Sequence, residues 1–125
     1  MFRVEFVSAL PIYLQIIQDL KQKIVSGEWP PNTRVPPVRE LSVSFGVNPN
    51  TAQRALSELE REGLLRTERT SGRFITDDKE LINRVRGEMA SSYAEEFLTR
   101  MSLIGFKAEE AVGLLNQNSK RGETT

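Results

Sequence analysis

The sequence predicts a mainly α-helical fold with a small β-hairpin: a winged helix-turn-helix domain followed by a two-helix C-terminal dimerisation region. Two observations predict it. Three helical segments precede two short β-type runs that flank the turn Thr70-Ser71-Gly72. A long helical segment with an apolar residue at every fourth position then follows. The predicted domains are residues 1–76 for the winged helix, 77–118 for the dimerisation region and 119–125 for a disordered tail.

The first helix is predicted to begin at Pro11 and to end at Gly27, and residues 1–9 before it are expected to form a short strand or an arm. A face of apolar residues recurs along this helix at Tyr13, Ile17, Leu20 and Ile24. A turn-rich connection follows, in which residues 33–35 are expected to form a short strand. The second helix is predicted to run from Pro37 to Gly46.

The third helix has the clearest start signal in the chain. Asn48 is a good N-cap, because its side-chain oxygen accepts from amides of the first turn, and Pro49 suits the next position. The helix is expected to end near Gly63, with its buried face formed by Ala52, Ala55, Leu56 and Leu59. The two small alanines allow this helix to pack closely across the second one.

The fourth helix is predicted to start with Asp77 as its cap, with Glu80 three residues later, and to end near Ile104. Its apolar stripe consists of Leu81, Val85, Met89, Tyr93, Phe97 and Met101. A winged helix of this size cannot cover such a stripe fully, so we expect it to pack against a second copy of the chain. The alternative is that the stripe folds back onto its own domain and onto the final helix, which begins near Lys107.

Composition narrows the classes of function. The chain has 125 residues and contains neither cysteine nor histidine, which removes disulfides, thiolate metal sites and the commonest general base. We therefore expect no enzyme, no cofactor and no metal site. No run of about 18 apolar residues is present, and the N-terminal stretch lacks the pattern of a signal peptide. The sequence thus predicts a cytoplasmic protein without a membrane segment.

The charges are balanced, with 17 basic and 17 acidic residues, which by itself argues mildly against binding to nucleic acid. Their distribution favours it. All seven basic residues from position 34 to position 73 are arginines, which bind phosphate and guanine in a bidentate way. Glutamates share this segment, and we expect three of them to form a solvated far end of the third helix: Glu58, Glu60 and Glu62.

Several motifs occur in a fixed order between Pro11 and Ile75. They are Pro11-Ile12-Tyr13, Arg39-Glu40-Leu41, Val47-Asn48-Pro49-Asn50-Thr51, Glu62-Gly63-Leu64, and Gly72 before Phe74. In this order they resemble the DNA-binding domain of GntR-type bacterial transcriptional regulators, and the short helical tail resembles the YtrA-like branch of that family. The resemblance implies a dimeric repressor, with the helix from Pro49 to Glu62 in the major groove and the hairpin as a wing near the minor groove.

The sequence departs from the family pattern at two positions. Pro37 stands where the family usually has serine, which removes a helix cap and a phosphate contact. Thr70 stands where the wing usually has its first glycine, which bears on how closely the wing tip approaches DNA.

The candidate DNA-binding residues lie on the third helix, at the start of the second, and along the hairpin: Arg34, Arg39, Asn48, Asn50, Thr51, Gln53, Arg54, Arg69, Gly72 and Arg73. We expect free backbone amides at residues 48–51 to suit a phosphate. Gln53 suits adenine and Arg54 suits guanine, and we expect at least one of them to contact phosphate instead of a base. The alternatives are solvated side chains, or Arg54 paired with Glu58 four residues on. For Arg39, the family resemblance implies an operator contact.

The sequence therefore predicts a sequence-specific DNA-binding transcriptional regulator, a dimeric repressor bound to an inverted-repeat operator. Its expected partners are double-stranded DNA and a second copy of the chain. Two questions stay open. One is whether an unidentified small-molecule effector binds near Tyr93, Glu96 or Arg100, and the other is whether the protein represses or activates transcription. The alternative function is a winged-helix module for protein–protein contacts without DNA binding.

Overall fold

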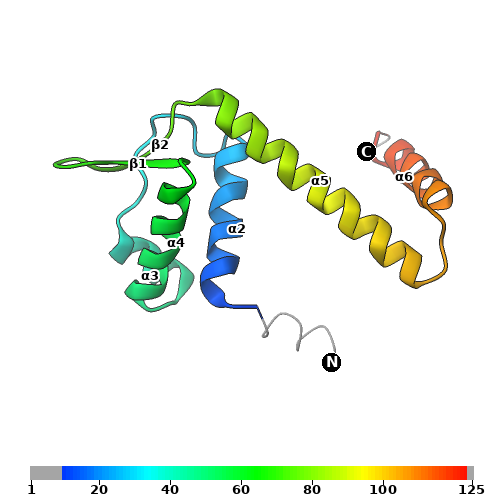
Figure 1. Cartoon of the computed structure of the whole chain (residues 1–125), viewed down its shortest axis with the longest axis horizontal. Helices are drawn as coiled ribbons and strands as arrows, with labels where there is room; N and C mark the ends of the chain where they lie inside the picture. Colours follow the sequence, from blue (N-terminus) through cyan, green and yellow to red (C-terminus); the bar gives the residue numbers. More distant parts are fainter. Residues whose placement is uncertain (1–9, 124–125) are drawn as a thin grey trace. The chain divides into compact units, whose positions relative to one another are not determined.

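The computed structural model describes residues 10–123, and the strand or arm expected at residues 1–9 lies outside them. The described residues form five helices and one two-stranded antiparallel sheet (Figure 1). The elements are α2 (Ile12–Val25), α3 (Val38–Phe45), α4 (Pro49–Arg61), β1 (Leu65–Glu68), β2 (Gly72–Ile75), α5 (Lys79–Leu103) and α6 (Ala108–Glu123). This order confirms the predicted fold class, a winged helix-turn-helix followed by two helices.

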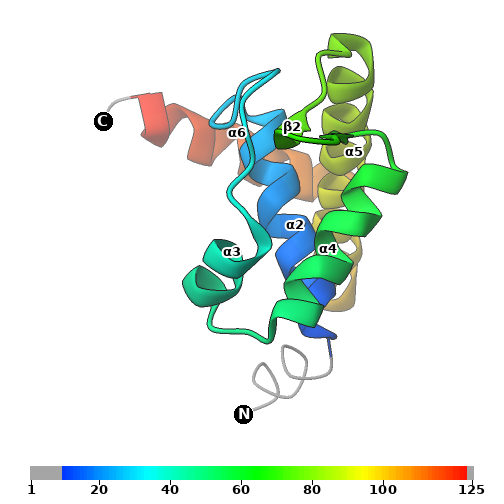
Figure 2. The same cartoon turned by 90° about the vertical axis from the view of Figure 1, so that its left-hand side faces the viewer.

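Helix α4 is the centre of the first part of the fold, since it packs against α2, α3 and β1 (Figure 2). Ala52 and Ala55 are almost completely buried, which confirms that their small side chains allow close packing of the helix. The larger core residues come from the helices and the hairpin: Ile16, Ile17, Leu20, Ile24, Val35, Leu41, Leu56, Leu59, Leu64, Leu65 and Ile75. This core fixes α4 so that its opposite face stays in solvent.

The wing is the hairpin of β1 and β2, with Leu65 opposite Ile75 and Glu68 opposite Gly72. The expected short strand at residues 33–35 is present as a single bridge between Arg34 and Phe74. Backbone hydrogen bonds hold it on β2, from the Val35 amide to the Arg73 carbonyl at 2.8 Å and from the Ile75 amide to the Thr33 carbonyl at 2.9 Å. The wing is therefore attached along one edge to the connection before α3.

Two helix starts can be compared with the predicted caps. The Asn48 side chain accepts a hydrogen bond from the Asn50 amide at 2.8 Å, which confirms Asn48 as the cap of α4. The expected cap of α5, Asp77, is wrong by one residue. The Asp78 carboxylate accepts from the Leu81 amide at 3.1 Å, and the Asp78 amide itself donates to the Thr76 hydroxyl.

The chain divides into two compact units within α5, the first ending at Arg86 and the second beginning at Gly87. This division lies later in the chain than the predicted boundary after residue 76. In the second unit the chain turns at Gly105, which has a φ of 93°, and Ala111 of α6 is fully buried. Helix α6 continues to Glu123, so residues 119–123 are helical where a disordered tail was expected, while residues 124–125 lie outside the described residues.

Among residues 10–123, no helix combines the length and the apolar character needed to span a bilayer.

Candidate nucleic-acid interface

The outer face of α4 is a polar surface, which we call the α4 flank and define as Asn50, Gln53, Arg54 and Ser57. All four residues are exposed, whereas the opposite face of the same helix is buried in the core. The Gln53 side-chain amide donates to the Ser57 hydroxyl at 3.1 Å, one helical turn away. The flank thus presents amide, hydroxyl and guanidinium groups to solvent on one side of the helix.

The start of α4 differs from the expectation. Free backbone amides were predicted there, but the amides of Asn50 and Thr51 already have acceptors in the protein. The Asn50 amide donates to the Asn48 side chain, and the amides of Thr51 and Ala52 donate to the Asn48 carbonyl at 2.9 and 3.2 Å. Pro49 has no amide to offer. The structure therefore favours side chains for a phosphate contact at this point, since the amides of Asn50 and Thr51 are already used within the helix start.

Arg54 takes a position that the sequence did not indicate. Its guanidinium carbon lies 3.7 Å from the centre of the Tyr13 ring, on α2. Tyr13 was predicted to face the core, but it is half-buried, and Ile16 beside it on the helix is buried instead. The expected alternative, a pair between Arg54 and Glu58, is not formed either, because the Glu58 carboxylate accepts from Arg61 at 2.6 Å.

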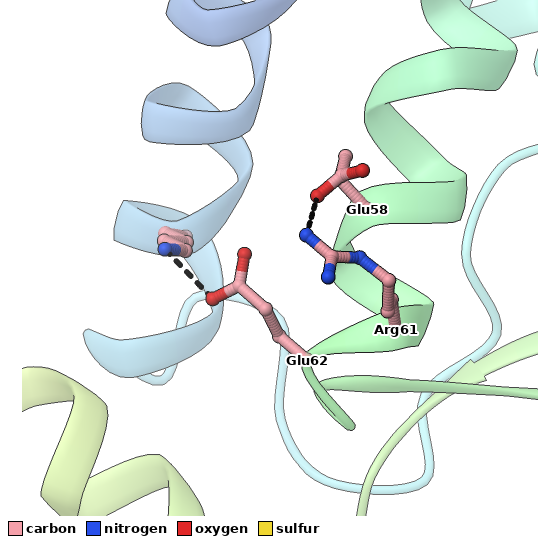
Figure 3. A network of polar contacts seen from close by, with 4 residues as sticks. Glu58, Arg61 and Glu62 are labelled. Carbon is pink, nitrogen blue, oxygen red and sulfur yellow. Dashed lines mark hydrogen bonds and ion pairs between the residues drawn. The ribbon is translucent and has the colours of Figure 1, made fainter.

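The acidic end of α4 was expected to be a solvated surface, and its three glutamates do lie at least partly in solvent, but each also has a charged partner within the domain. Glu62 forms an ion pair with Lys21 of α2 at 2.9 Å, and Figure 3 shows this contact beside the pair of Glu58 and Arg61. The pKa of the Glu58 carboxyl is lowered from its ordinary value, mainly because Arg61 donates a hydrogen bond to it. The negative charges are therefore largely matched by neighbours within the domain.

Glu60 is the third of these glutamates, and it joins α4 to both strands of the wing. One carboxylate oxygen lies 3.5 Å from the Nε of Arg73 on β2, and the other accepts a hydrogen bond from the Thr67 hydroxyl on β1. The Arg73 Nε is itself buried. Arg73 was predicted to contact DNA; its Nε lies beside Glu60, while the residue also lines the groove between the wing and the start of α3.

Arg34 and Gly72 form the next part of the surface. Gly72 has a φ of 104°, and the Arg34 guanidinium lies across it so closely that a Cβ at Gly72 would be 3.2 Å from the Arg34 Nε. Both residues, with Arg69 at the wing tip, line a groove of about 360 Å³ between the wing and the start of α3. Within residues 10–123, neither Arg34 nor Arg69 has an ion pair with a carboxylate.

Arg39 lies at the start of α3 and is exposed. Pro37, the preceding cap position, makes no side-chain hydrogen bond to the helix, as the departure from the family pattern predicts. The structure therefore leaves three exposed arginines around the α4 flank, at the start of α3 and on the wing: Arg34, Arg39 and Arg69.

Sequence reasoning missed three residues that shape this surface. Tyr13 supports Arg54, and Glu60 holds the wing. Arg66 donates to the Ile75 carbonyl at 3.0 Å and lies over the Phe74 ring, which stiffens the hairpin. Tyr13 and Glu60 act through contacts between separate elements and Arg66 acts across the hairpin, so no helical or strand period indicates them.

The predicted dimerisation stripe divides between the two units. Val85 is buried in the first unit, and a Leu81 methyl group lies 3.1 Å from where a Cβ at Gly63 would stand. These two residues therefore pack on the winged helix. The remaining members, in the second unit, are half-buried or exposed: Met89, Tyr93, Phe97 and Met101. The two ionic residues of the suggested effector site, Glu96 and Arg100, pair with each other at 3.7 Å.

Within the described part of the chain, no group of three or more histidine, cysteine, aspartate or glutamate residues is placed to hold a metal ion.

Comparisons with known proteins agree with this geometry. The family model described as bacterial regulatory proteins, gntR family, matches residues 12–75. An uncharacterised helix-turn-helix transcriptional regulator of Bacillus subtilis, YhcF, is 37% identical over 106 residues, which cover 85% of this chain and 88% of the relative. The transcriptional repressor YtrA of the same organism is 41% identical over 78 residues, covering 62% of this chain and 60% of the relative.

Solved structures are also similar. A GntR family transcriptional regulator from Listeria monocytogenes superimposes with a TM-score of 0.80 at 33% identity, covering 86% of this chain and 95% of that one. The AraR DNA-binding domain, solved in complex with an operator, superimposes with a TM-score of 0.52 at 31% identity over 54% of this chain and 81% of that one. Taken with the family model, these matches establish that the chain belongs to the GntR family of bacterial transcriptional regulators.

Proposed function

We propose that this protein binds operator DNA as a dimer and controls transcription by occupying that operator. The observation that carries the proposal is the α4 flank. Asn50, Gln53 and Ser57 are exposed on a helix whose other face is completely buried, so the helix is held firmly while its polar side remains available. A helix presented in this way fits the major groove of B-DNA, which is about 12 Å wide.

The residues around the flank divide into two groups by their chemistry. Asn50 and Gln53 carry amides, which pair with the edge of adenine. The exposed arginines at the start of α3 and on the wing carry positive charge without a carboxylate partner, which suits backbone phosphates. We assign base reading to the first group and phosphate binding to the second, with Thr51 adding a hydroxyl contact to phosphate.

Binding to duplex DNA is supported by two relatives. The AraR domain, with the same fold, was solved on an operator, and the relative YtrA is named a repressor. Direct occupancy by this chain would repress in the same way if its operator overlaps a promoter. Such a role places the protein in the cytoplasm, with the chromosome.

A dimer is supported by the second unit, which exposes many large apolar side chains. Those exposed by more than a third include Tyr93, Leu98, Leu103, Ile104, Phe106, Val112 and Leu115. Burying them against a second copy would relate two winged helices by a two-fold axis. The two α4 helices would then enter major grooves about 34 Å apart, so the operator should be a rough inverted repeat.

The test is selection of bound duplexes from a random pool by the purified full chain, followed by affinity measurements over a range of salt. We expect enrichment of an inverted repeat and a steep fall of affinity with salt, because neutralised phosphates release counterions. Gln53→Ala should relax the preference at one position of each half-site, whereas Thr51→Ala should weaken all sequences equally. A pool that shows no enrichment even at low salt would contradict the proposal and favour the module for protein–protein contacts.

A further inference from the structure

We propose that Tyr13 is a positioning residue for DNA binding: it draws the Arg54 guanidinium away from the centre of the α4 flank and holds it for a backbone phosphate. The inference rests on the proposed function and adds a division of roles on the recognition helix. It starts from the contact between the Arg54 guanidinium and the Tyr13 ring, 3.7 Å apart across α4 and α2.

The position of Arg54 on the helix makes this contact informative. Asn50, Arg54 and Ser57 are spaced at i, i+4 and i+7, so they share the most outward face of α4. An arginine at that place would extend towards the floor of the groove, where the bases lie. The Tyr13 ring instead holds the guanidinium at the side of the helix that faces α2. The outward face is then left to the shorter side chains of Asn50, Gln53 and Ser57.

The stacked guanidinium keeps its capacity to bind an anion. Its N–H donors lie in its own plane, so a ring on its face leaves them available. No ion pair or hydrogen bond joins Arg54 to a carboxylate in the described residues, because the near carboxylate of Glu58 is held by Arg61. Arg54 is therefore fixed in direction by an aromatic ring and, although Glu58 acts on it through space, forms no ion pair within the described residues. A phosphate at the rim of the groove supplies an anionic partner.

Tyr13 itself is placed for this role and not for the core. It is half-buried, while Ile16, Ile17 and Leu20 on the same helix fill the interior. Helix α2 also packs along α4, so the ring has a fixed distance from the recognition helix. Fixing one long side chain before binding removes part of the entropy that it would otherwise lose on the DNA.

The test is a double-mutant cycle of Tyr13→Leu and Arg54→Ala in the full chain, measured on a duplex selected by the wild type and on the same duplex with single base changes. Tyr13→Leu should lower affinity about two- to fivefold for each recognition helix engaged, the ratio that corresponds to an exposed cation–π contact. It should have no further effect once Arg54 is alanine. Tyr13→Phe, which keeps the ring, should bind like the wild type.

Two controls separate positioning from general damage. Arg39→Ala removes another exposed arginine of the proposed interface, one on α3 that leaves the Glu58–Arg61 pair in place, and in this background Tyr13→Leu should keep its full effect. The proposal also predicts that Arg54→Ala lowers the affinity for every base variant of the duplex by the same factor. The slope of log affinity against log salt concentration should fall by about the value for one phosphate contact. A change of base preference by Arg54→Ala, or equal effects of Tyr13→Leu with and without Arg54, would overturn it.

A measurement without DNA distinguishes this inference from the proposed function. In the NMR spectrum of the free protein, the Arg54 side-chain protons should be shifted upfield by the ring of Tyr13, and Tyr13→Leu should abolish the shift. Absence of the shift in a wild type that binds its operator would overturn the positioning role and leave DNA binding intact. A shift in a protein that binds no duplex would refute both.

Discussion

The two compact units of this chain differ in how far they bury their apolar residues. The first, through Arg86, encloses a core in which Ala55, Leu56, Leu59, Leu64 and Ile75 have no exposed surface. The second unit begins at Gly87. Among its described residues, Ala111 is the single apolar residue with no exposed surface, while Leu103 is 81% exposed. The first unit therefore has a closed core in a single copy, whereas the second leaves most of its large apolar side chains exposed.

This difference suggests a separate role for each unit, DNA contact for the first and self-association for the second. A complete core keeps α4 rigid, so the α4 flank can meet DNA with its side chains already placed. An incomplete core needs a partner, and a second copy supplies the same surface by symmetry. We therefore expect substitutions in the first unit to act on folding and DNA contact, and substitutions in the second to act on self-association.

The largest effect should come from Leu56→Ala in the core of the first unit. Leu56 has no exposed surface, so truncation leaves a cavity and should cost about 3 kcal/mol of unfolding free energy. Leu115→Ala, at a site that is 48% exposed in the second unit, should leave the stability of the winged helix unchanged. Denaturant unfolding of both variants, followed by circular dichroism, tests the contrast, and equal losses would contradict it.

Phe97→Glu should split the dimer, because it places a charge in the half-buried stripe of α5. We expect the dimer dissociation constant to rise by about 100-fold, equivalent to about 2.7 kcal/mol. Thr99→Glu adds the same charge on another side of the helix and should leave the dimer intact. Sedimentation at several concentrations measures both, and a Phe97→Glu variant that remains dimeric would remove the stripe from the interface.

Glu60→Ala should loosen the wing while leaving the second unit unchanged. It removes the carboxylate that lies 3.5 Å from the Arg73 Nε and accepts from the Thr67 hydroxyl, which should cost about 1 kcal/mol. Glu58→Ala is the matched control, since its pair with Arg61 lies at the surface, and should leave stability almost unchanged. Amide hydrogen exchange should rise in β1 and β2 for Glu60→Ala alone. Unchanged exchange there would show that Glu60 does not fix the wing.

The smallest effects should come from two glycines that respond in opposite directions. Gly113 lies within α6 with open space at its Cβ position, so Gly113→Ala should stabilise the second unit by about 0.5–1 kcal/mol through helix propensity. Gly72→Ala should instead destabilise the wing by about 1 kcal/mol or more, because of its positive φ and the Arg34 side chain above it. Thermal unfolding checks both signs. A loss of stability for Gly113→Ala would place that residue in a close contact between subunits.

The sequence predicts the elements of the fold well, because each has a local signal. Asn48 and Pro49 give the start of α4, the alanines give its buried face, and the turn before Gly72 gives the hairpin. The candidate site is predicted less fully. Arg54 contacts Tyr13, and Arg73 contacts Glu60. Such pairs depend on how separate elements pack together, and this packing produces no periodic pattern in the sequence.

Even the correct signals had consequences that the sequence does not show. The cap at Asn48 was predicted, but Asn48 accepts hydrogen bonds from the amides of Asn50 and Thr51, which were expected to bind phosphate. The stripe of α5 was also visible as a period of four, yet Leu81 and Val85 are used by the first unit because the division falls after Arg86. Periodicity identifies an apolar face but not the surface that it meets.

The most direct test of this account is the stoichiometry of the complex on selected DNA. Sedimentation of the wild type with a duplex that carries the enriched inverted repeat should give two chains per duplex, and a duplex with one half-site should bind far more weakly. A stable complex of one chain on the half-site, with undiminished affinity, would contradict the account, because the second unit would then have no part in operator binding.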